Sequence, residues 1–162
     1  MLLKVKNKET LIIDEFRFKC SIGKNGFKKN KFEGDGSTPA GLFGIGKLYW
    51  RRDRVRKPET KISCKVIKKK MIWCDDPNNN YYNKETKIKN VKGEKLFRKD
   101  YRYNYFLVIQ YNTKKIIKNK GSAIFLHLTK NYKKTQGCIA VSEKDFLIIA
   151  KLISRNSKIK IN

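Results

Sequence analysis

The sequence contains a single histidine, His127, and its four cysteines never stand at the CxxC spacing of a zinc site or a dithiol redox motif. A Cys/His metal site needs several such ligands in closely spaced groups, so we expect neither a metal nor a cofactor. Free buried thiols are expected, with a Cys64–Cys74 disulfide as the alternative in an oxidising compartment.

Long apolar runs are also missing. The longest have five residues, 105–109 and 146–150, whereas a membrane-spanning helix needs about 20. The first residues, MLLKVKNKETLIID, hold no apolar core of the length found in secretory signals, so no export signal is visible.

Acidic residues are few: 14 Asp and Glu stand against 40 Lys and Arg, for a net charge of +26. Such a surface favours anionic partners, among them nucleic acid, acidic lipid and cell-wall polymers. Lys, Asn and Ile are all abundant, however, and the basic residues are spread along the whole chain. We therefore favour biased composition over a nucleic-acid interface, and keep a non-catalytic basic binding protein as an alternative function.

The remaining pattern predicts one mainly β domain over residues 1–162. Ten short segments rich in Ile, Val, Phe and Tyr are bounded by Gly, Asn and Pro, which is typical of strands. They are 2–6, 10–13, 16–22, 42–50, 61–67, 71–74, 103–111, 123–128, 138–141 and 158–161. One helix is expected at about residues 142–154, with Ser142 as its N-cap and apolar residues at helical spacing from Phe146 onward.

The only histidine stands eleven residues before Cys138, and the two lie near the ends of predicted strands. A cysteine attacks as the thiolate, and an imidazole can take its proton, so the pair predicts acyl transfer by a cysteine nucleophile. The second nitrogen of His127 then needs an acceptor, for which we expect a backbone carbonyl of residues 121–123. Either residue alone would be assigned to the core.

Four ordered blocks resemble the L,D-transpeptidase catalytic domain, often called the YkuD domain. They are GDGSTPAGLFGI (34–45), WCDDPNNNYYN (73–83), GSAIFLH (121–127) and TQGCIAV (135–141). The resemblance covers nearly the whole chain. It implies a β-sandwich or barrel-like fold with one helix on the C-terminal side.

The resemblance also implies an enzyme of the periplasm or cell envelope that acts on peptidoglycan stem peptides. Such enzymes form a thioester with the stem and pass the acyl group to an amine. Related members use water as the acceptor, as L,D-carboxypeptidases do, or act on a lipoprotein link. Because no signal peptide is visible, a cytoplasmic location stays open.

Carried over residue by residue, the resemblance makes Cys138 the nucleophile and His127 the general base and acid. Gly137 would supply a backbone N–H to the oxyanion hole, and Thr135 occupies the family's Ser/Thr position. The chain departs from many relatives at Gln136, where His is common, and likewise at Ala140 and Leu128. These departures leave substrate choice and the acceptor open.

Five further residues are candidates for binding the stem peptide. Glu33 and Asp35 could hold a cationic group, Trp73 could form a wall, and Arg98 with Tyr101 could bind a carboxylate. Each has a structural alternative: turn formation for the acids, core packing for the tryptophan and a solvated charged segment for the last two.

Overall fold

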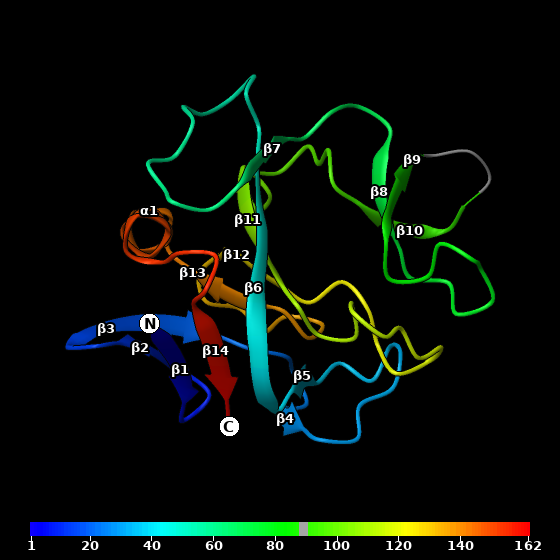
Figure 1. Cartoon of the computed structure of the whole chain (residues 1–162), viewed down its shortest axis with the longest axis horizontal. Helices are drawn as coiled ribbons and strands as arrows, with labels where there is room; N and C mark the ends of the chain where they lie inside the picture. Colours follow the sequence, from blue (N-terminus) through cyan, green and yellow to red (C-terminus); the bar gives the residue numbers. More distant parts are fainter. Residues whose placement is uncertain (88–90) are drawn as a thin grey trace.

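The computed structural model describes residues 1–87 and 91–162 of the chain, and most of its regular structure is β (Figure 1). In chain order the elements are β1 (Leu2–Lys6), β2 (Thr10–Ile13), β3 (Phe16–Ser21), β4 (Phe27–Lys28), β5 (Thr38–Pro39), β6 (Gly41–Trp50), β7 (Cys64–Val66), β8 (Met71–Cys74), β9 (Glu85–Lys87), β10 (Gly93–Lys95), β11 (Tyr105–Ile109), β12 (Phe125–Leu128), β13 (Ile139–Val141), α1 (Glu143–Leu152) and β14 (Lys158–Ile161).

The main sheet closes on itself. Its nine strands follow the order β11-β12-β13-β3-β2-β1-β14-β6-β7, and an additional pairing joins β11 to β6. The long strand β6 makes this closure, because its first half pairs with β14 and its second half with β11. The two ends of the chain meet in the same sheet, where β1 runs parallel to β14. The result is a barrel-like sheet, as the resemblance implies.

Alternation along the strands fills the inside of this sheet. In β1 the side chains of Leu3 and Val5 are buried while their neighbours are exposed, and β14 repeats the pattern with Ile159 and Ile161. Successive side chains of a strand point to opposite faces, so each of these strands contributes one apolar row to the core. The register Leu3–Ile159 brings the two rows together.

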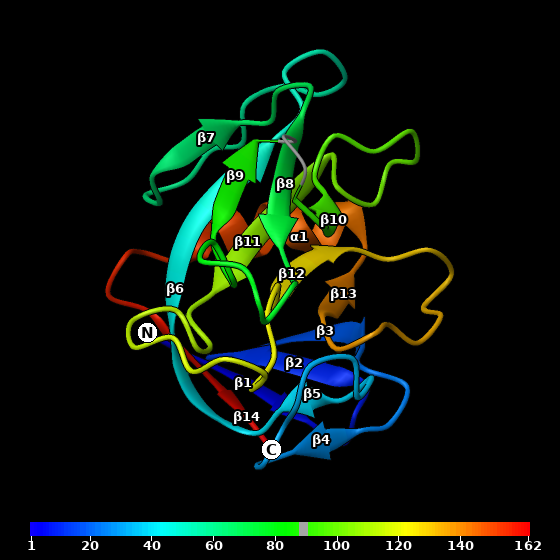
Figure 2. The same ribbon diagram turned by 90° about the vertical axis from the view of Figure 1, so that its right-hand side faces the viewer.

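Strand β11 is buried on both faces, which explains its unbroken apolar sequence. Leu107 and Ile109 belong to the core inside the main sheet. Phe106 and Val108 belong to a second, largely aromatic cluster that lies between the main sheet and the small sheet β10-β8-β9. Figure 2 shows β8, β9 and β10 in front of β11 and β12.

Helix α1 follows directly on β13. The hydroxyl of Ser142 accepts a hydrogen bond from the N–H of Asp145 at 3.1 Å, which confirms the expected N-cap. Phe146 turns inward and stacks on Tyr105, with ring centroids 5.7 Å apart. The helix ends at Leu152, two residues before the end that the sequence predicts. No helix in the described residues has the length and hydropathy of a membrane span.

The ten predicted strands all occur: four have the predicted bounds, five are shorter, and β6 begins one residue earlier than predicted. Four strands were not predicted. Strands β4 and β5 have only two residues each, and β9 and β10, with the sequences ETK and GEK, carry no apolar alternation and depend on pairing with β8. The four cysteines are free thiols; Cys20 and Cys74 are buried, whereas Cys64 and Cys138 are partly exposed.

A buried hydroxyl joins three loops below the main sheet. Thr38 is 0 % exposed, and its Oγ1 accepts a hydrogen bond from the N–H of Gly23 and donates one to the carbonyl of Gly137, each at 2.8 Å. The loops approach so closely that a Cβ on Gly23 would lie 2.5 Å from the carbonyl oxygen of Gly36. The block GDGSTP thereby holds the segment that leads into β13.

Replacement of Thr38 by valine tests this connection. Thr38→Val keeps the shape of the side chain but leaves a buried N–H and a buried carbonyl without partners. We expect the free energy of unfolding to fall by about 1–3 kcal/mol, measured by urea denaturation. The matched control is Thr113→Val, since Thr113 lies in a loop and makes no side-chain hydrogen bond in the described structure. Equal losses in the two variants would contradict the role assigned to Thr38.

Candidate active site

Cys138 sits at the end of a tight turn that enters β13. Thr135 shapes this turn, because its Oγ1 accepts a hydrogen bond from the N–H of Gly137 at 3.1 Å and donates one to the carbonyl of Cys138 at 2.6 Å. Gly137 has φ +144°, and a Cβ there would lie 2.9 Å from the carbonyl oxygen of Ser37. Glycine is therefore required before the cysteine.

The thiol of Cys138 is held by backbone groups. Its Sγ donates to the carbonyl of Ala123 at 3.2 Å and accepts from the N–H of Phe125 at 3.4 Å. The side chain packs against the aromatic cluster, and this burial raises the pKa of the Cys138 thiol to about 12. At neutral pH the group is a protonated thiol.

Ala123 holds its carbonyl toward the thiol through an uncommon backbone conformation, with φ +52°. Its N–H donates to Oδ1 of Asn83 at 3.1 Å, and the same oxygen accepts from the indole N–H of Trp73 at 2.8 Å. The blocks WCDDPNNNYYN and GSAIFLH are thus connected physically, since the asparagine that ends the first fixes the alanine of the second.

His127 lies within β12, between Phe106 of β11 and Ala140 of β13 in the sheet register. Its Nδ1 donates to the carbonyl of Leu128 at 2.8 Å, which leaves the lone pair of Nε2 available. The acceptor expected within residues 121–123 is therefore wrong: the carbonyl of Ala123 binds the Cys138 thiol instead.

The environment of His127 keeps its imidazole neutral. The residue is 6 % exposed, and burial lowers its pKa to about 4, with the charges of Arg102 and Arg98 acting in the same direction. The ring of Tyr103 packs edge-on against it, with centroids 5.3 Å apart. The imidazole is thus a free base throughout the neutral range.

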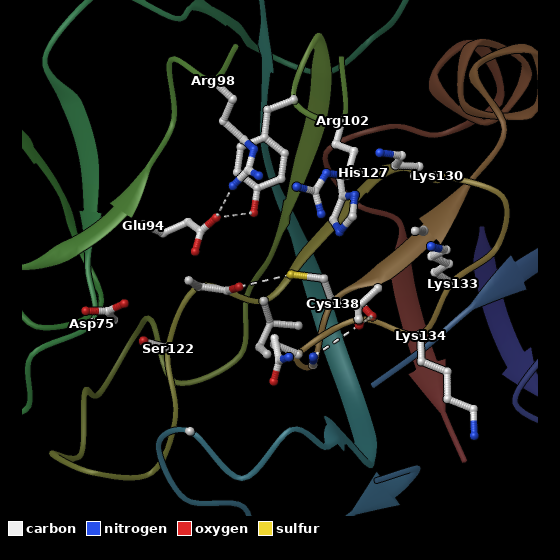
Figure 3. Close-up of a pocket in the computed structure, with 18 of the residues that line it drawn as sticks. Asp75, Glu94, Arg98, Arg102, Ser122, His127, Lys130, Lys133, Lys134 and Cys138 are labelled. Carbon is white, nitrogen blue, oxygen red and sulfur yellow. Dashed lines mark hydrogen bonds and ion pairs between the residues drawn. The ribbon is translucent and has the colours of Figure 1, made fainter. Parts of the chain in front are cut away.

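Cys138 and His127 line one cleft of about 580 Å³, and Figure 3 shows both side chains pointing into it. The parallel pairing of β12 with β13 brings them together across the ten residues that separate them in the sequence. No hydrogen bond joins the thiol to the imidazole among the described residues. The cleft therefore holds a neutral thiol and a neutral base side by side.

The backbone offers one free donor beside the sulfur. The N–H of Gly137 already donates to Thr135, whereas the N–H of Cys138 has no acceptor within residues 1–87 and 91–162. A negative charge that develops on a substrate oxygen near Sγ would meet the Cys138 N–H first.

The cleft brings together four of the residues that the sequence suggested for substrate binding. Thr135, Gln136, Glu33 and Arg98 line it. Arg98 is held there by an ion pair with Glu94 at 3.0 Å.

Three other candidates do not line the cleft. Asp35 is buried in an ion pair with Lys31 at 2.6 Å and accepts the N–H groups of Phe32 and Ser37, so it shapes a turn. Trp73 is a core residue that binds Asn83, and Tyr101 lies exposed on the surface. These three residues therefore take the structural roles given above as alternatives to substrate binding: Asp35 shapes a turn, Trp73 packs in the core, and Tyr101 lies on the solvated surface.

Sequence reasoning did not single out several residues that line the cleft. They are Lys31, Glu94, Arg102, Tyr103, Ser122, Lys130, Lys133 and Lys134. Asp75 also lines it; in the sequence, Asp75 and Asp76 are candidates for binding an amine, with turn formation in an Asn-rich loop as the alternative. The three lysines stand between His127 and Cys138 in the sequence, so the loop that joins these two residues had to lie near both. The others come from segments whose approach depends on the sheet topology.

The described residues contain no group of three or more His, Cys, Asp or Glu side chains placed to hold a metal ion. No curated protein matches the chain at a significant level. Residues 2–161, nearly the entire sequence, match the family described as L,D-transpeptidase catalytic domain (YkuD). With its mainly β, barrel-like architecture and this match, the chain belongs to the YkuD family of L,D-transpeptidase catalytic domains.

Proposed function

We propose that the protein is a peptidoglycan L,D-transpeptidase that forms a thioester between Cys138 and a stem peptide and transfers it to an amine. The family acts on peptidoglycan. The observation that carries the finer proposal is the placement of the Cys138 thiol and the free Nε2 of His127 in one cleft. The reaction takes place at the cell envelope, where this substrate lies.

The neutral state of both groups sets the order of events. The thiol leaves the carbonyl of Ala123 and turns toward His127, whose Nε2 takes the proton as Sγ attacks the amide carbonyl. The N–H of Cys138 stabilises the developing oxyanion. His127 then gives the proton to the departing amine, and the thioester remains on Cys138.

The second half of the reaction uses the same base. His127 takes a proton from the acceptor amine, which attacks the thioester carbonyl and releases the cysteine. Water in the place of the amine would make the enzyme an L,D-carboxypeptidase with the same residues and the same thioester. The reaction products therefore show whether the acceptor is an amine or water.

Replacement of the nucleophile is the direct test. With purified muropeptides we expect the wild-type protein to give cross-linked dimers, and Cys138→Ala to lower the rate by at least about a thousandfold, because no other thiol lines the described cleft. Mass spectrometry of the products reports both outcomes, and released tripeptides alone would indicate hydrolysis.

Cys64→Ala serves as the control, because this half-buried cysteine lies in β7 and does not line the cleft. It should keep wild-type rates. Turnover that survives Cys138→Ala would exclude the thioester mechanism. Binding of nucleic acid that is steeply salt-dependent, in a protein without turnover, would instead favour a basic binding module.

The pH dependence of alkylation tests the neutral pair. The thiolate is the species that reacts with iodoacetamide, and the pKa of Cys138 is raised to about 12. Below that pKa the thiolate fraction grows tenfold per pH unit, so the rate at Cys138 should rise by roughly this factor per unit from pH 7 to 10. The pKa of His127, lowered to about 4, predicts no inflection between pH 5 and 8.

The measurement follows the Cys138 peptide by mass spectrometry, which separates it from the other three thiols. A thiolate paired with an imidazolium would produce a different curve, with a rate that is already constant near neutral pH. Such a plateau would contradict a neutral thiol at Cys138 beside a neutral imidazole at His127.

A further inference from the structure

The charges that line the active-site cleft are divided between its two sides. Figure 3 shows Glu94, Asp75 and Ser122 on one side of Cys138, and Arg102 with Lys130, Lys133 and Lys134 on the other. Nine charged side chains line the cleft: three are acidic (Glu33, Asp75 and Glu94) and six are basic (Lys31, Arg98, Arg102, Lys130, Lys133 and Lys134). This arrangement of charged side chains suits a substrate that carries both a positive and a negative group.

The basic side is open for an anionic group. Lys130, Lys133 and Lys134 are exposed and form no ion pair in the described part of the chain. Arg102, in contrast, is tied to Asp100 at 3.1 Å. Carboxylates of a peptide that crosses the thiol would therefore be drawn to the three lysines.

The opposite side carries Glu94 and Asp75 together with one cation, Arg98. Lys31 also lines the cleft, but it is bound to Asp35 at 2.6 Å. Glu94 is neutralised by Arg98 and accepts a hydrogen bond from Tyr103 at 3.0 Å. Glu33 accepts a hydrogen bond from the hydroxyl of Tyr82, which is not a cation. Asp75 makes no ion pair and no side-chain hydrogen bond with the described residues, although it is half-buried.

A second observation on this side concerns a hydroxyl. Ser122 is 7 % exposed, lines the cleft, and its Oγ is one of two buried side-chain atoms that have no hydrogen-bond partner among the described residues. A buried hydroxyl without a partner costs about 1–3 kcal/mol, so such atoms are rare unless a ligand uses them. Ser122 lies on the same side as Asp75 (Figure 3).

We propose that Asp75, Glu33 and the Ser122 hydroxyl form a subsite for a primary ammonium group of a stem peptide. This rests on the proposed function, since it assigns one charged group of that substrate. An ammonium group donates three hydrogen bonds, which suits two carboxylates and one hydroxyl. With the lysines opposite, the subsite orients the peptide across the sulfur.

The local electrostatics agree with this assignment. Burial raises the pKa of Asp75, and the charges of Glu33 and Glu94 raise it further. The carboxylates of Asp75, Glu33 and Glu94 repel one another, and a bound cation would reduce this repulsion.

Binding measured without turnover provides the test. The protein is Cys138→Ala, and the probes are a stem tetrapeptide with a free side-chain amine and the same peptide with that amine acetylated. Isothermal titration calorimetry should show about tenfold or stronger preference for the free amine, because charged hydrogen bonds contribute about 1.5–3 kcal/mol. Asp75→Asn in the same background should abolish the preference, and Ser122→Ala should reduce it.

Asp76→Asn is the matched control, because Asp76 is the next residue, caps the N–H of Asn78 and does not line the cleft. It should leave the preference unchanged. Thermal unfolding of each variant verifies that it is folded.

A second arm identifies which peptide carries the ammonium group. If it belongs to the acceptor, Asp75→Asn leaves binding of the tetrapeptide unchanged but lowers the ratio of dimer to hydrolysed tripeptide in the enzyme that retains Cys138. The subsite would be refuted if Asp75→Asn changed neither the preference for the free amine nor the product ratio. It would also be refuted if Asp76→Asn had effects equal to those of Asp75→Asn. Absence of turnover in the wild type would refute the proposed function alone, since the binding arm stays readable.

Discussion

The hydroxyl of Thr38 is the interaction on which the geometry around the nucleophile depends. It joins strand β5 to the loop after β3 and to the turn before β13, and these segments meet where no side chain fits. Close approach of backbones requires glycine at Gly23 and Gly137, and it leaves polar groups that only a small hydroxyl can satisfy. The nucleophile turn is thereby fixed to the N-terminal part of the barrel-like sheet.

Burial governs the chemistry as much as the fold. The same aromatic cluster that covers the outer face of β11 and β12 removes water from the sulfur and from the imidazole. Desolvation disfavours the charged form of each group, so it raises the pKa of Cys138 and lowers that of His127. The packing around the two groups therefore favours a neutral thiol and a neutral imidazole over an ion pair.

The strands, the N-cap at Ser142 and the meeting of His127 with Cys138 could be predicted because alternation, capping and residue type are local signals. The hydrogen-bond partner of His127 could not be predicted. The choice between the carbonyls of Ala123 and Leu128 depends on the positive φ of Ala123, for which the sequence gives no signal. Asp35 shows the same limit: its burial with Lys31 arises from loop packing, and in the sequence it resembles a ligand-binding acid. Charge alone did not distinguish Asp75 from Asp76.

The hydrogen bond from Cys138 to the carbonyl of Ala123 also affects how readily the thiol is oxidised. Peroxides convert cysteine to sulfenic acid and then to irreversible acids by reaction with the thiolate, and they need access to the sulfur. A protonated thiol that is packed against aromatic rings and held by backbone groups reacts slowly with such oxidants. We therefore expect Cys138 to be oxidised slowly as long as it stays protonated and hydrogen-bonded to the backbone, without any disulfide partner.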